Sequence, residues 1–133
     1  MSTLVVGTLK GVSGSLPPVV QNSSGTEIGY FAKAWIVFDG TGTVSITDSK
    51  NISTLTDVGT GIYKVAFTNN MPSANYVPVG IGQRQSGNSD VRVMAYDANS
   101  SPPWSASEFQ FEMMASTGDN PVDSPKCAIA FIG

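Results

Sequence analysis

The segment Glu108-Phe-Gln-Phe-Glu-Met-Met114 alternates apolar and polar side chains along most of its length. Its two Phe residues and its first Met fall on one side of an extended chain, and its Gln and Glu residues fall on the other. This period of two is typical of an antiparallel β-strand that buries one face. A helix would repeat its apolar positions every three or four residues instead. The segment therefore predicts a strand with one face in a hydrophobic core.

Two other segments carry the same pattern. In Gly61–Thr68 the side chains at positions 63, 65 and 67 are apolar, while Lys64 points the other way. In Lys126–Ile132 positions 127, 129 and 131 form an apolar face, which is backed by Ala128 and Ala130. Both segments are typical of half-buried strands.

The rest of the chain has the same character. Short runs rich in Val, Ile, Thr, Phe and Tyr lie between frequent Gly and Pro residues, and no stretch has the apolar spacing of a sizeable helix. These runs predict strands at Lys33–Phe38, Thr43–Asp48, Ile52–Thr56, Gly61–Thr68, Asn75–Ile81, Val91–Tyr96, Glu108–Met114 and Lys126–Ile132. About eight strands joined by turns indicate an all-β fold, an antiparallel β-sandwich or jelly-roll-like domain.

The first 30 residues differ from the remainder. They hold two short β-capable pieces, Leu4–Val6 and Leu16–Val20, which are broken by Gly and Pro. Such a segment can hardly bury itself, so we expect either an arm that lies on a neighbouring subunit or a partly ordered edge strand. The chain is accordingly divided into an N-terminal arm or attachment segment, 1–30, and a β-sandwich domain, 31–133.

The composition of the chain argues against two classes of binding partner. Charged residues make up 13 % of the 133 residues, about half of the usual quarter. The 7 basic residues are scattered, and no run approaches the roughly 20 apolar residues of a membrane span. We therefore expect neither nucleic acid nor a membrane as a partner. The N-terminus lacks the features of a signal peptide, so we expect synthesis in the cytoplasm.

The residue types needed for most catalysis are missing or badly placed. The chain has no histidine, the commonest general base near neutral pH and the usual zinc ligand. Its one cysteine, Cys127, lies in an apolar strand, where a thiol is normally inert. Glu108 and Glu112 share a strand face but would lie roughly 13 Å apart, which is far for a catalytic pair. We therefore predict no enzymatic activity and no cofactor.

One loop contains oxygen donors that would suit Ca²⁺, namely Asp119, Asn120 and Asp123. The spacing of an EF-hand is absent, and Asp-Asn-Pro is ordinary turn chemistry. We interpret the loop as a turn and predict no metal site, although the residues alone leave ion binding open.

Two groups of residues are candidates for binding. Trp104, which follows two prolines, and the loop residues Gln85 and Asn88 are candidates for contact with a partner or receptor. For Trp104 the favoured interpretation is that it folds back and caps one end of the sandwich. A second group is a candidate subunit interface and consists of Trp35, Tyr30 and Phe31. Trp35 could also belong to the core.

An ordered series of motifs runs through residues 32–76. It reads Ala32-Lys-Ala-Trp35, Gly40-Thr-Gly-Thr-Val44, Asp57-Val-Gly-Thr-Gly-Ile-Tyr-Lys-Val-Ala-Phe67 and Met71-Pro-Ser-Ala-Asn-Tyr76. This series resembles the pattern of phage tail-fibre and related virion structural proteins. The closing Ala-Ile-Ala-Phe-Ile-Gly of residues 128–133 is similar to the final strand of such domains.

The resemblance implies a tail-fibre-type β-domain on the surface of a phage virion, which acts by self-assembly as a homotrimer in contact with other virion proteins. It also implies that the variable residues 83–103 could contact a glycan or protein on the host surface. The quoted motifs contain no fibrous shaft, so a capsid decoration (cement) protein that stabilises the phage head is an alternative. A free-standing carbohydrate-binding module is a second alternative.

Overall fold

The computed structural model describes residues 20–29, 31–87, 90–96, 104–118 and 120–133. The chain divides into two compact units between Phe31 and Ala32. The described part of the first unit is a hairpin of β1 (Val20–Gln21) and β2 (Glu27–Gly29). Its turn is held by the Asn22 side chain, whose Oδ1 accepts hydrogen bonds from the backbone N–H groups of Ser24 and Thr26.

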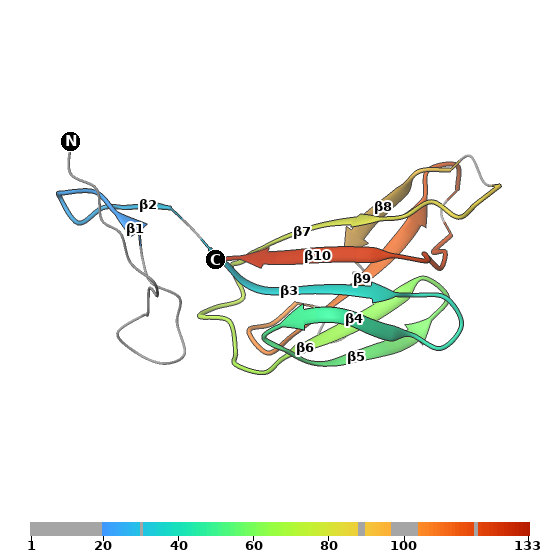
Figure 1. The fold of residues 1–133 in the computed structure, drawn as a ribbon, viewed down its shortest axis with the longest axis horizontal. Coiled ribbons are helices and arrows are strands. Elements are labelled where there is room, and N and C mark those ends of the chain that lie inside the picture. The colour runs from blue at the N-terminus through green and yellow to red at the C-terminus, as the bar shows by residue number, and fades with distance from the viewer. Residues whose placement is uncertain (1–19, 30, 88–89, 97–103, 119) are drawn as a thin grey trace. The chain divides into compact units, whose positions relative to one another are not determined.

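The second unit is a single antiparallel sheet of eight strands (Figure 1). The strands are β3 (Ala32–Asp39), β4 (Ser45–Lys50), β5 (Ile52–Gly59), β6 (Ile62–Phe67), β7 (Val77–Gly82), β8 (Arg92–Tyr96), β9 (Glu108–Ala115) and β10 (Cys127–Ile132). Their order across the sheet is β4-β3-β10-β7-β8-β9-β6-β5. The described residues contain no helix. The predicted all-β, antiparallel fold of about eight strands is confirmed.

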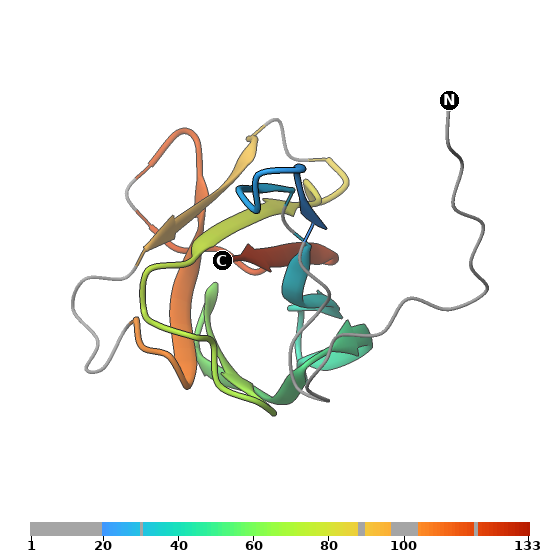
Figure 2. The ribbon, with the colours of Figure 1, turned by 90° about the vertical axis from the view of Figure 1, so that its left-hand side faces the viewer.

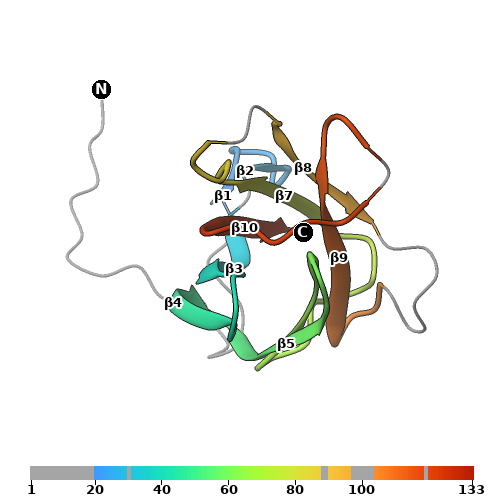
Figure 3. The ribbon, with the colours of Figure 1, turned by 90° about the vertical axis from the view of Figure 1, so that its right-hand side faces the viewer.

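The sheet curls around one core (Figures 2 and 3). Its two edge strands, β4 and β5, are consecutive in the chain and come into contact without forming a hydrogen-bonded ladder. Asn51 joins them in the left-handed backbone region, with φ at 59°. The two halves of the curled sheet therefore face each other across the core, as the two layers of a sandwich do.

The core consists of the inward side chains that the alternation predicted. Residues 63, 65 and 67 of β6, 109, 111 and 113 of β9 and 127, 129 and 131 of β10 are all buried. Aromatic rings fill the space in edge-to-face pairs, such as Phe38 with Tyr63 and Phe67 with Phe131, whose ring centroids lie 5.0 Å apart in each pair. Such pairs favour one defined packing of the interior.

Candidate functional site

Four neighbouring strands share a largely apolar outer face, which is interrupted by Lys33 and Asp39 near the two ends of β3. Inward residues of β3 and β10, such as Ile36 and Ile129, are at most 3 % exposed, so the residues that alternate with them point outward, and the register continues the same face across β7 and β8. In β10, β7 and β8 every outward side chain within the strand is apolar. We call this surface the apolar wall; it consists of Trp35, Val37, Val77, Val79, Ile81, Val93, Ala95, Ala128, Ala130 and Ile132.

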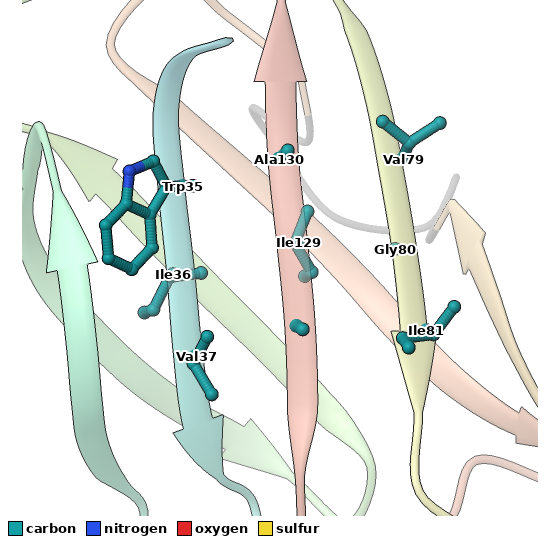
Figure 4. Close-up of a pocket in the computed structure, with 9 residues that line it drawn as sticks. Trp35, Ile36, Val37, Val79, Gly80, Ile81, Ile129 and Ala130 are labelled. Atoms are coloured by element: carbon teal, nitrogen blue, oxygen red, sulfur yellow. The ribbon is translucent and has the colours of Figure 1, made fainter.

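The register of the strands gives the wall a groove and a ridge. Ala130 lies between Trp35 and Val79 in neighbouring strands, and Ala128 lies between Val37 and Ile81. Because the alanine side chains are short, β10 forms the floor of an open groove of about 450 Å³ (Figure 4). Val79 and Ile81 form the ridge beside it and are 49 % and 72 % exposed.

The other outer faces of the sheet mix apolar residues with charged and polar ones. Asp48 and Lys50 lie on β4 next to the wall. On the opposite half of the sheet Lys64 of β6 pairs with Glu108 of β9 at 3.5 Å. Polar outer residues are the rule for an antiparallel sheet with one solvated face, so the wall departs from that rule. Apolar patches of this kind on a protein surface mark places of interaction.

The structure describes two of the three candidate subunit-interface residues, and these two belong to different units of the chain. Trp35 lies on the outer face of β3 and lines the groove (Figure 4). Phe31 is 45 % exposed and belongs to the first unit of the chain. Tyr30 lies outside the described residues.

Trp104 packs inward, against the rings of Tyr76, Tyr96 and Phe109. Its indole Nε1 is buried and has no hydrogen-bond partner among the described residues. Only part of the side chain is exposed, and its ring contacts are with the core rather than with the wall. Trp104 thus packs at one end of the core and is not brought together with Trp35.

The structure describes one of the two candidate loop residues. Gln85 is exposed in the loop that follows β7. Asn88 lies outside the described residues. The partner-contact prediction for these two side chains therefore rests on the sequence.

The loop considered for Ca²⁺ is tied into the fold through its last acidic residue. Asp123 Oδ1 accepts hydrogen bonds from the Gly61 backbone N–H at 2.7 Å and from the Tyr63 hydroxyl at 3.2 Å. Asp119 lies outside the described residues, and the described residues contain no group of three or more acidic, Cys or His side chains that could hold a metal ion. The visible role of Asp123 is to fasten this loop to β6.

The one thiol of the chain is enclosed. Cys127 is fully buried in β10, and burial raises the pKa of its thiol to about 11. The thiolate, which is the nucleophilic form, is therefore scarce near neutral pH. The environment of Cys127 is that of a core residue.

Sequence reasoning named Trp35 but missed the remainder of the wall. A signal was present, because Cys127–Ile132 and Val77–Ile81 lack polar residues on both faces. Strands that are apolar on both faces are typical of strands covered on both sides.

The fold and the wall define a compact all-β domain with a surface of the interface type. No protein-family model, curated protein or solved structure matches the chain. Among the described residues no helix has the length and apolar character needed to cross a membrane.

Proposed function

We propose that this chain is a structural protein of a bacteriophage virion, a tail-fibre-type β-domain on the particle surface that works by assembly and not by catalysis. The observation that carries the proposal is the apolar wall. It is supported by the ordered motifs of residues 32–76, which resemble those of phage virion proteins. The proposed assembly is a homotrimer that also contacts other virion proteins.

The energetics of the wall favour assembly. Four of its side chains, Val77, Val79, Ile81 and Val93, are each between 49 % and 72 % exposed. Full burial of one Val or Ile side chain is worth about 1.5–3 kcal/mol relative to full exposure. Covering the wall with protein would therefore contribute several kcal/mol, which an isolated domain forgoes.

Contact with the host would fall to the loops and not to the wall. Gln85 is exposed in an uncharged stretch, Gln85–Gly87, next to the end of β7. Polar, uncharged side chains of this type can hydrogen-bond to a glycan or to a protein surface. A host-surface ligand is therefore part of the proposal for those of the residues 83–103 that lie outside β8.

The principal experiment is to locate the protein on a particle. Immunogold electron microscopy of phage particles with an antibody against this chain should label the tail. Labelling of the head would favour the capsid decoration protein, in which case particles lacking the protein should rupture at lower temperature and regain stability when it is added. Particles without any label would overturn a virion role.

A glycan array tests the remaining alternative. Tyr96 is 41 % exposed, and its ring centroid lies 5.3 Å from that of Trp104, which is the feature that most favours a carbohydrate-binding module. A monomeric chain that binds one defined sugar and loses that binding in Tyr96→Ala would support the module and contradict the virion proposal.

A further inference from the structure

We infer that the apolar wall is the contact surface between copies of this chain, with the β7 ridge of one copy seated in the β10 groove of the next. The inference rests on the proposed self-assembly. It adds the surface that makes the contact and the strands that meet there.

The ridge on β7 and the groove floor on β10 have the same spacing of side chains. The ridge residues Val79 and Ile81 are two positions apart on β7, and the floor residues Ala130 and Ala128 are their register partners on β10. The spacing along the ridge is therefore the same as the spacing along the floor, about 6.6 Å. The groove runs between β3 and β7, two strand spacings or about 9.6 Å apart, which is wide enough for one row of Val and Ile side chains from a facing sheet.

The charge distribution of the wall also favours a second copy. The outward residues of β10, β7 and β8 are all uncharged, so a charged partner would lose hydration without gaining an ion pair. A second copy brings the same uncharged centre, because Lys33 and Asp39 of β3 lie near the two ends of that strand. The net charge of only −3 adds little repulsion between copies.

The wall is large enough for the centre of a protein contact but not for the whole of one. Four strands spaced about 4.8 Å apart and about six residues long cover roughly 400 Å² in projection. That is about half of the ~800 Å² that each partner buries in a standard interface. The wall would form the apolar centre, and neighbouring polar residues such as Asp48 and Lys50 would form the rim.

The first test places a charge on the ridge. Val79→Asp should weaken self-association at least tenfold, because the carboxylate would have to be buried without a partner. Val58→Asp is the matched control, since Val58 lies on β5 outside the wall and is 48 % exposed, against 49 % for Val79. Sedimentation velocity over a concentration series gives the mass and the dissociation constant, and circular dichroism verifies that both variants are folded.

The second test examines the pairing of ridge with groove. Ala130→Lys in the floor should weaken self-association by itself, as Val79→Asp does. A mixture of the two variants should associate more tightly than either variant alone, because the Asp of one copy then meets the Lys of the other.

Three results would overturn the inference: a wild-type chain that stays monomeric at millimolar concentration, a Val79→Asp chain that associates like Val58→Asp, or a mixture no tighter than its components. Failure here is separable from failure of the proposed function. If the antibody labels virions but Val79→Asp does not weaken the oligomer, the virion role stands and the wall is rejected as the contact surface. If the antibody labels no virion but Val79→Asp does weaken the oligomer, the wall stands as the contact surface and the virion role is rejected.

Discussion

Gly40 lies at one end of the core, where its backbone approaches the buried ring of Tyr63. The Tyr63 hydroxyl donates a hydrogen bond to the Gly40 carbonyl at 2.8 Å, and the Gly40 N–H donates to the Ser124 carbonyl at 3.0 Å. A Cβ at position 40 would collide with the Tyr63 hydroxyl and approach the Ser124 carbonyl oxygen at 3.1 Å. Glycine is therefore required here by the closeness of two chain segments.

Gly40→Ala should lower the free energy of unfolding by about 1–3 kcal/mol, the usual cost of forcing extra volume into a packed site. Gly59→Ala is the control, because a Cβ there meets nothing within 4 Å and its backbone is not in the left-handed region. Urea denaturation of the two variants provides the comparison. Equal midpoints would contradict the close approach.

The buried thiol and phenol groups make the free energy of unfolding decrease at alkaline pH. Burial raises the pKa of Cys127 from 9.0 to about 11, and it raises the pKa values of Tyr63 and Tyr76 above their ordinary 10.0. In each case the unfolded chain loses its proton at a lower pH than the folded chain does. These groups therefore leave stability unchanged below about pH 9 and reduce it as the pH rises further.

The Cys127 contribution to this loss should be roughly 2–3 kcal/mol once the pH has passed about 11. Cys127→Ala should be less stable than wild type at pH 7, because it leaves a small cavity. The difference should shrink as the pH rises from about 9 to about 10.5, since only wild type then loses the thiol's contribution. Urea titrations across this range measure it, and parallel pH curves for the two proteins would argue against the raised thiol pKa.

At the scale of elements, the corner between β4 and β5 closes the sheet. Asn51 holds this corner with a positive φ, and its side chain bridges to the end of β6. Its Oδ1 accepts the Asn69 backbone N–H at 2.8 Å, and its Nδ2 donates to the Asn69 carbonyl at 2.9 Å. One residue thus provides the left-handed bend between the two edge strands and ties that corner to the end of β6.

Asn51→Ala should destabilise the fold by about 2–3 kcal/mol, because it combines a strained backbone with the loss of three side-chain hydrogen bonds to Asn69. Asn51→Gly should cost about 1 kcal/mol less, since glycine adopts the bend freely and loses only the side-chain bonds. Thermal and urea unfolding of both variants separate the two effects. If Ala and Gly were equally harmful, the backbone conformation would not matter at this corner.

At the scale of the whole molecule, the wall should determine how association responds to solvent. An apolar contact without ion pairs at its centre should change little between about 0.05 M and about 0.5 M NaCl. Sulfate should strengthen it, because sulfate is excluded from apolar surface. Sedimentation velocity at the low NaCl concentration, at the high NaCl concentration and in sulfate measures this response. Dissociation of the oligomer by NaCl would indicate a contact held by charge.

The sequence by itself determined where the eight strands of the second unit lie and, for β6, β9 and β10, which side faces the core. Alternation is a local property, since the period of a strand places successive side chains on opposite faces whatever its neighbours are. For the same reason β9 and β10 were predicted to within one residue at each end. The β2 strand was not predicted, because Glu27–Gly29 is too short to show a period.

Only the tertiary structure decided which outward faces lie together. Trp35 was a candidate from the sequence, and Ala128 and Ala130 were visible as the apolar backs of a strand. Nothing local places β10 between β3 and β7, because that order depends on pairing between segments that are about 45 to 100 residues apart in the chain. This long-range pairing sets small alanines between the larger Trp35 and Val79, and so joins the outer faces of β3, β10 and β7 into the part of the wall that forms the groove.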